Sequence, residues 1–215
     1  MRARCALTER PDHRQQTSLC VAVDVHYLRS GSARAAAVVA ADATFCHVLA
    51  ERTAVVPEVA PYRPGEFYRR ELPPLRAVLQ DISGLGLLVI DGYADLDPGG
   101  RPGLGAYASA EFGVPVIGVA KTRFRTATHA IAVHRGTAAR PVFVTAAGMS
   151  RVDAAELVRL MAGGFRIPDA LRHADQLARA GPARNSSRSP ISVTAIGDDP
   201  DAIGDAHQGA NRGSS

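Results

Sequence analysis

The stretch "VAVDVHY", residues 21–27, places an acidic side chain inside a run that otherwise has the pattern of a buried β-strand. Side chains alternate along a strand, so the three valines share one face and Asp24 falls on the other. A carboxylate inside a buried strand loses hydration, and no partner for it lies nearby in the sequence. The stretch therefore raises the question of whether Asp24 faces a cation of the protein or a metal ion.

The composition is that of one globular domain. The chain has 215 residues, of which 46% are hydrophobic and 21% charged, enough for a full core. A formal net charge of +4 is a weak indication of nucleic acid as partner. The 3 cysteines form no C-x-x-C pair, which argues against a disulfide framework or a zinc site. Without an apolar run of about 18 residues or a signal-like leader, we expect a cytoplasmic protein that does not contact membranes.

The first half of the chain predicts a meander followed by a helical region. β-type runs at 18–27, 34–42 and 45–56 are separated by short turns, which favours three antiparallel strands. Residues 61–82 have a helical pattern that contains the pair Pro73-Pro74. Because proline disfavours helical geometry at the residue before it, we expect a turn of helix, a break, and a helix from about Pro74.

The second half alternates between strands and helices. The expected strands are 86–91, 114–121, 129–134 and 141–146, and the expected helices are 104–112 and 151–162. This order resembles the ribonuclease H-like arrangement, an α/β fold in which parallel strands extend an antiparallel three-strand meander and helices flank the mixed sheet. Residues 181–215 are rich in Gly, Ser, Asn, Asp and Pro, so we expect a domain over 1–180 and a disordered C-terminal tail.

Two carboxylates are expected to meet at one edge of this sheet. Asp24 lies late in the first strand, and Asp91 ends the strand expected to lie parallel and adjacent to it. Neighbouring carboxylates repel each other unless a proton or a cation lies between them, and oxygen ligands suit Mg²⁺ or Mn²⁺. Two alternatives remain open: Asp91 as the turn residue of a "DG" pair, and Asp24 as the partner of an arginine.

Three other residues stand out along the chain. On local evidence Glu71 in "FYRRELPP" is a solvated charge beside two arginines, and Lys121 is the polar end of an apolar strand. Tyr62 lies in "PYRPG" between two prolines, where it packs in a rigid turn or remains exposed. A rigid exposed aromatic ring can stack on nucleic-acid bases or wedge between them.

Four separated segments resemble the signature segments of the endonuclease V family of deoxyinosine-directed repair nucleases. They are "VAVDVHY", "PYRPGEFYRRE", "LLVIDGY" and "VPVIGVAKTR", and the resemblance spans about residues 10–180. The segment "RIPDALRHADQLAR" (166–179) is similar to that family's C-terminal segment. The resemblance implies a ribonuclease H-like fold, Mg²⁺ or Mn²⁺ as cofactor, and hydrolysis of a phosphodiester bond 3′ to a deaminated base in DNA, or in RNA for some members.

The resemblance also implies roles for individual residues. Asp24 and Asp91 would hold the metal, with Glu71 as a ligand or beside the ligands, and Lys121 would lie near the scissile phosphate. These four are the expected catalytic residues of a metal-dependent endonuclease.

Three more residues would bind the nucleic acid. Tyr62, with Arg63 beside it, would belong to the wedge that opens the helix at the lesion, and Gly92 would let the backbone approach a flipped base. DNA or RNA is thus the expected partner, and the protein is expected to act as a monomer.

The sequence departs from the family pattern at several positions. In "DGYADLDPGGRPG", Tyr93 and Asp97 stand where the family usually has histidines, and Met149 stands where a histidine would support the metal. Methionine is a poor ligand for a hard cation. Asp153 could supply the missing oxygen, but Ser150 and Asp153 also have the spacing of a helix capping box.

Two classes of function therefore remain. One is a working metal-dependent endonuclease, and the other is a catalytically weakened member that acts as a nucleic-acid-binding protein. The retained carboxylates and lysine favour the enzyme, because a pure binder has little use for clustered carboxylates next to phosphate.

Overall fold

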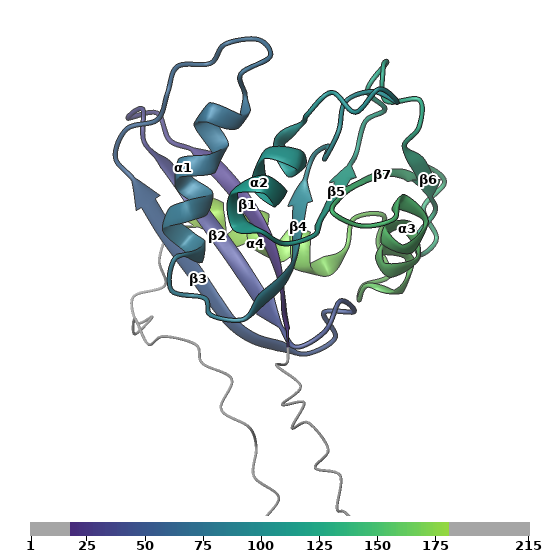
Figure 1. The fold of residues 1–215 in the computed structure, drawn as a ribbon. Coiled ribbons are helices and arrows are strands. Elements are labelled where there is room, and N and C mark those ends of the chain that lie inside the picture. The colour runs from purple at the N-terminus through teal and green to yellow at the C-terminus, as the bar shows by residue number, and fades with distance from the viewer. Residues whose placement is uncertain (1–17, 181–215) are drawn as a thin grey trace, which may run out of the picture.

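A mixed sheet forms the centre of the chain in a computed structural model that describes residues 18–180 (Figure 1). Its strands are β1 (Leu19–Tyr27), β2 (Ala33–Ala40), β3 (Val48–Val56), β4 (Leu85–Asp91), β5 (Val116–Ala120), β6 (Ile131–Val133) and β7 (Val142–Ala147). They lie in the order β3-β2-β1-β4-β5-β7-β6. The first three strands are antiparallel, β4 pairs parallel to β1, and β5 pairs parallel to β4. The predicted meander with parallel extension is confirmed.

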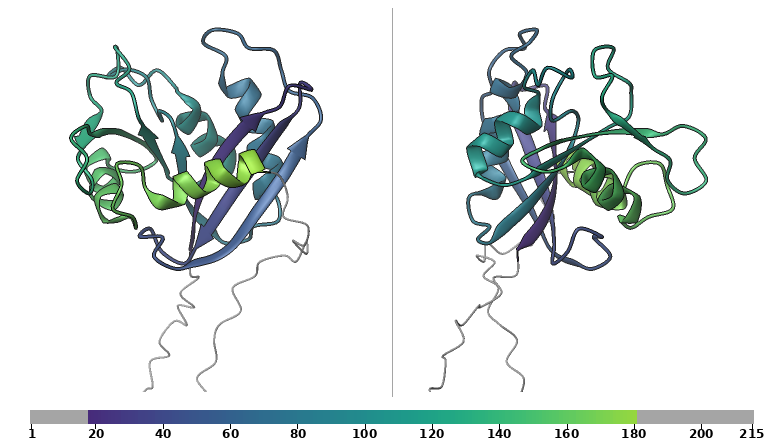
Figure 2. Two further views of the ribbon diagram at one scale, coloured as in Figure 1. Left: turned by 180° about the vertical axis from the view of Figure 1, so that it is seen from behind. Right: turned by 45° about the vertical axis from the view of Figure 1, so that its right-hand side comes forward.

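Four helices cover the two faces of the sheet within the described residues. They are α1 (Tyr68–Leu79), α2 (Leu104–Phe112), α3 (Arg151–Leu160) and α4 (Asp169–Ala180). One core lies under α1 and α2, and the other lies under α3 and α4 (Figures 1 and 2). Val21 and Val23 pack into the first core and Ala22 into the second. Both faces of β1 are therefore buried, which explains its nearly continuous apolar run.

The prediction of a break at Pro73-Pro74 was wrong, because α1 runs without interruption through both prolines. Two prolines remove two amide donors from the helix, which has a cost. The buried face of α1 offsets it, since Leu72, Leu75 and other apolar side chains pack onto the sheet beside β1 and β2. Tertiary packing thus outweighs the local preference of the residue before a proline.

Helix α4 forms from the segment that sequence patterning had left without a defined element. Its buried residues Ala170, Leu171, Ala174 and Ala178 lie on one helical face, which packs against β1 and β2. Arg34 of β2 donates a hydrogen bond to the carbonyl oxygen of Ala178 at 3.0 Å. Because of this packing, α4 lies across one face of the sheet, the face to which Asp24 of β1 belongs (Figure 2).

A buried arginine closes the C-terminal end of α3. Arg135 is 4% exposed, and its guanidinium donates to the carbonyl oxygens of Met161, Ala162, Gly163 and Phe165. Met161 is the C-cap of α3 and the other three residues lie in the loop before α4, so the arginine holds the end of α3 and this loop together.

Replacement of this arginine is expected to destabilise the fold strongly. Arg135→Leu keeps an apolar side chain but removes the donor from four carbonyl oxygens, among them that of the buried Met161, so unfolding should become easier by about 3 kcal/mol or more. Urea unfolding of the variant, with Arg140→Leu as an exposed control, measures this difference. Equal unfolding free energies for the two variants would contradict the interpretation.

Candidate active site

Three neighbouring parallel strands bring their ends to one edge of the sheet. Asp24 lies near the end of β1, Asp91 ends β4, and Lys121 follows β5 directly. Alternation along each strand places Asp24 with Ala22 and Asp91 with Val89, and both of these neighbours pack in the core beneath α4. The structure therefore brings Asp24 and Asp91 together, as predicted for adjacent strands, and adds Lys121 beside them.

Lys121 is paired with one of the carboxylates. Its Nζ lies 2.6 Å from Oδ2 of Asp91, and its side chain is about half exposed. Partial burial acts to lower the pKa of Lys121, but the hydrogen bond and charge of Asp91, with the charges of Asp24 and Asp175, raise it overall. The amine is therefore firmly cationic and stands at the mouth of an acidic cluster.

Asp24 meets a residue that sequence reasoning did not single out. Asp175 of α4 forms a side-chain hydrogen bond with Asp24, and Arg179 Nε donates to Asp175 Oδ1 at 2.8 Å. Burial, then the charge of Asp91, then the hydrogen bond with Asp175 raise the pKa of Asp24 to about 7. Burial alone would raise the pKa of Asp175 as well, but its hydrogen bonds with Arg179 and Asp24 lower it. The contact between the two carboxyl groups therefore raises the pKa of Asp24 and lowers that of Asp175.

A signal for Asp175 was present in the sequence. The segment 166–179 had been noticed as similar to the family's C-terminal segment, and Asp175 lies four residues after the buried Leu171. At this spacing the two side chains lie on nearly the same face of a helix. Recognition of 169–180 as a helix would have placed Asp175 against the sheet.

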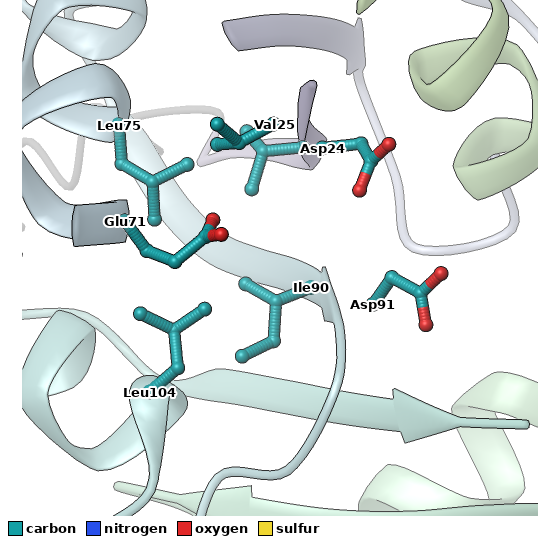
Figure 3. Close-up of a pocket in the computed structure, with 8 residues that line it drawn as sticks. Asp24, Val25, Glu71, Leu75, Ile90, Asp91 and Leu104 are labelled. Atoms are coloured by element: carbon teal, nitrogen blue, oxygen red, sulfur yellow. The ribbon is translucent and has the colours of Figure 1, made fainter. Parts of the chain in front are cut away.

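Glu71 reaches the same place from the other face of the sheet. It is 6% exposed, and it accepts a hydrogen bond of 2.5 Å from the hydroxyl of Tyr27, whose ring lies 4.1 Å from the Arg70 guanidinium carbon. Burial raises the pKa of Glu71 to about 7, although the Tyr27 hydrogen bond and Arg70 act to lower it. Glu71, Asp24 and Asp91 line one small pocket, into which Glu71 points from α1 (Figure 3). The interpretation of Glu71 as a solvated surface charge is therefore wrong.

The acidic cluster has the chemistry of a hard divalent cation site. Its donors are carboxylate oxygens, and Asp24 and Asp175 lie close enough to hydrogen-bond with each other. Within residues 18–180, no three acidic, histidine or cysteine side chains already stand as a closed set of ligands. Asp91 is turned toward Lys121 instead. Asp24, Asp91 and Asp175 are the residues that could hold Mg²⁺ or Mn²⁺, with Glu71 beside them.

A larger pocket with aromatic walls adjoins the acidic cluster. It has about 770 Å³ of empty space, including its open mouth, and Asp91 and Gly92 form part of its wall. The aromatic residues that line it are Phe67, Tyr68, Tyr93, Tyr107 and Phe124. The rings of Tyr68 and Tyr107 are stacked with centroids 3.7 Å apart. Gly92 has φ 145°, a conformation that side chains with a Cβ rarely adopt, so this turn needs glycine.

Two of the residues predicted to bind nucleic acid lie outside the acidic cluster. Tyr62 and Arg63 are in the loop between β3 and α1, and the Tyr62 side chain is 61% exposed. The packing interpretation of Tyr62 is therefore wrong. Gly65 of the same loop lines the aromatic pocket, so the loop borders the pocket without placing Tyr62 in its wall.

Met149 does not stand at the metal site, and its interpretation as a missing ligand needs correction. β7 runs antiparallel to β5, so Ala147 at the end of β7 pairs with Val116 at the start of β5. Lys121 lies five residues further along, roughly 15 Å away at the rise of a strand. Met149 instead packs against the core beneath α3 and α4.

Asp153 does not replace a ligand either. It is exposed in the first turn of α3, where Ser150 is the N-cap and its hydroxyl accepts a 3.2 Å hydrogen bond from the amide of Val152. The capping interpretation is therefore favoured for this pair. Asp97 pairs with Arg101 at 3.4 Å within its own loop.

Comparison with known proteins identifies a family. A family model described as Endonuclease V matches residues 2–139. The Endonuclease V of Streptomyces avermitilis is 34% identical over 200 residues, which cover 83% of this chain and 86% of the relative. That of Streptomyces coelicolor is 34% identical over 204 residues, or 84% of this chain and 85% of the relative.

Solved structures show the same fold. The crystal structure of the Streptomyces avermitilis Endonuclease V has a TM-score of 0.64 at 32% identity and covers 76% of this chain and 81% of its own. Ciona intestinalis Endonuclease V, in complex with a 24mer DNA that contains an inosine followed by a ribo-adenosine, has a TM-score of 0.66 at 19% identity, covering 75% and 84%.

Sheet order, acidic cluster and structural neighbours together define a ribonuclease H-like α/β protein of the nuclease class. The chain belongs to the Endonuclease V family. In the part of the chain that the structure describes, no helix is both long and apolar enough to cross a membrane.

Proposed function

We propose that this protein is a divalent-metal-dependent endonuclease that hydrolyses a phosphodiester bond on the 3′ side of a deaminated base, deoxyinosine or inosine, in DNA or RNA. One observation supports the proposal more than any other. Asp24 and Asp91 meet Asp175 at the sheet edge, next to a cationic lysine and an open aromatic pocket. Family membership supports the same activity, and one relative has been solved with inosine-containing DNA.

The acidic residues would hold Mg²⁺ or Mn²⁺ through Asp24, Asp91 and Asp175. When bound, such an ion supplies a water of lowered pKa and stabilises charge on the phosphate oxygens. Lys121 places a positive charge beside Asp91, where it can bind a phosphate oxygen and offset the negative charge that grows during hydrolysis. Glu71 is held by the Tyr27 hydroxyl and has a pKa of about 7, so it can accept a proton near neutral pH.

The aromatic pocket offers a place for the recognised base. Its flat rings suit the π-face of a base taken out of its stack, and Gly92 leaves room for close approach of the backbone. The pocket shares Asp91 with the acidic cluster, so a base in the pocket would place its own backbone near the cluster. This adjacency links recognition of a base to cleavage close by.

The decisive test of this function is a nicking assay. Inosine-containing and plain strands of DNA and RNA are incubated with the protein and Mg²⁺ or Mn²⁺, and the cut position is mapped. We expect metal-dependent cleavage 3′ to inosine and little cleavage of plain strands. Strand binding without cleavage under either metal would instead favour the weakened nucleic-acid-binding protein.

Tyr62 is expected to contribute to substrate binding. Tyr62→Ala should weaken binding to an inosine-containing strand by about 1–3 kcal/mol, the usual value of one base–aromatic stack. Fluorescence titration at fixed salt measures the change. Phe165→Ala is the matched control, because Phe165 is also an exposed ring, at 60%. Equal affinities for the wild type and the Tyr62 variant would contradict the wedge role.

We also propose that the folded domain ends with α4, at Ala180. Residues 1–17 and 181–215 lie outside the described part of the chain, and the low apolar content of 181–215 supports the proposal. A chain that ends at Ala180 should melt within a few degrees of the full chain. A much lower melting temperature would show that the omitted residues stabilise the domain.

The proposal includes action in the cytoplasm as a monomer. The small number of cysteines, without a C-x-x-C pair, supports a reducing compartment. Light scattering of the purified chain tests the oligomeric state.

A further inference from the structure

Tyr93 ties together the two loops that flank the site. It follows Gly92 in the loop after β4, and its hydroxyl donates a 2.8 Å hydrogen bond to the carbonyl oxygen of Thr122. The hydroxyl oxygen of Tyr93 in turn accepts a 2.8 Å hydrogen bond from the amide of Phe124. A tyrosine hydroxyl has one proton to donate and can accept as well, so this pair of bonds uses it in both senses.

The tethered segment, Lys121–Phe124, has no regular secondary structure and carries two functional positions. At one end, Lys121 Nζ contacts Asp91 at 2.6 Å. At the other end, the Phe124 ring lines the aromatic pocket, with its centroid 5.9 Å from that of Tyr93. The carbonyl oxygen of Lys121 is itself held by the guanidinium of Arg166. The segment is thus held from both sides, and Tyr93 provides the hold on the pocket side.

We propose that Tyr93 is a positioning residue that couples base recognition to cleavage, because one hydroxyl fixes both the lysine beside Asp91 and the Phe124 wall of the pocket. The inference rests on the proposed function but goes beyond it.

Tyr93→Phe is the direct test, because it keeps the ring and removes both hydrogen bonds. On an inosine-containing strand, kcat should fall and KM should rise, with kcat/KM lower by about 10–100-fold, as expected when reacting groups shift by about 1 Å. The preference for inosine over a plain strand should fall too. Amide exchange at Phe124 should become faster, while the melting temperature changes little.

Thr126→Val is the matched control. The Thr126 hydroxyl donates a 2.6 Å hydrogen bond to the carbonyl oxygen of Leu96, which also joins the loops after β4 and β5. Its removal loosens the same pair of loops but leaves the Lys121–Phe124 segment tethered. We expect this variant to keep the wild-type kcat, KM and inosine preference.

Two results would overturn the inference. One is a Tyr93→Phe protein with wild-type inosine preference and kcat, and the other is an equal loss of preference in Thr126→Val. A wild-type protein that cleaves neither strand contradicts the proposed function instead. In that case the tether is judged by amide exchange alone, and unchanged exchange at Phe124 in Tyr93→Phe overturns it.

Discussion

Asp91→Asn is expected to abolish cleavage while leaving the chain folded. Asp91 ends β4 between Asp24 and Lys121, so the substitution removes a proposed metal ligand and the partner of the lysine at once. Loss of a metal's charge stabilisation in the transition state is worth several kcal/mol, so the rate should fall by about 1,000-fold or more. The amide is nearly the same size as the carboxylate, and the surrounding strands should therefore be undisturbed.

Three measurements together test this expectation. Nicking of an inosine-containing strand gives the rate, circular dichroism reports the fold, and calorimetry with Mn²⁺ reports metal binding. Asp97→Asn is the matched control, because Asp97 lies in the loop directly after Asp91 and pairs only with Arg101 among the described ion pairs. Equal Mn²⁺ binding by the wild type and Asp91→Asn would remove Asp91 from the metal site.

The strands were predictable from the sequence because each is a compact apolar run bounded by turn residues. The location of Asp24 and Asp91 followed from that order, since adjacent parallel strands end on the same side. Helix 104–112 was also predicted with the bounds that the structure shows for α2. Local sequence patterns were therefore enough to predict the sheet and half of the acidic cluster.

Local patterns could not predict the contributions that depend on packing. The preference of the residue before a proline predicted a break in α1, but the helix continues because its apolar face is buried on the sheet. The resemblance to the family likewise suggested that Met149 belongs to the metal site. The antiparallel direction of β7, which only the sheet order reveals, sends Met149 to the opposite end of β5.

The corrected position of Met149 matters most for the role of Asp175. If Met149 occupied a metal-ligand position, Met149→His should restore a missing ligand and raise the rate about 10–100-fold. The structure instead supplies an oxygen from α4, where Asp175 already hydrogen-bonds with Asp24. Met149→His is therefore expected to leave the rate per folded molecule unchanged, with some loss of stability because the histidine enters a site that packs against the apolar core.

Asp175→Ala is expected to have the opposite outcome. Cleavage should fall by about 100-fold or more with little change in stability, because Asp175 is only half-buried midway along α4 and α4 keeps its buried apolar residues. Asp169→Ala, in the first turn of the same helix, is the control for general damage to α4. Nicking rates at saturating Mn²⁺, normalised to folded protein, compare all three variants. A gain from Met149→His together with full activity of Asp175→Ala would place the remaining ligand at the end of β7 and refute the role of α4. Loss of activity in Asp175→Ala alone would mean that the helix overlooked by sequence patterning completes the metal site.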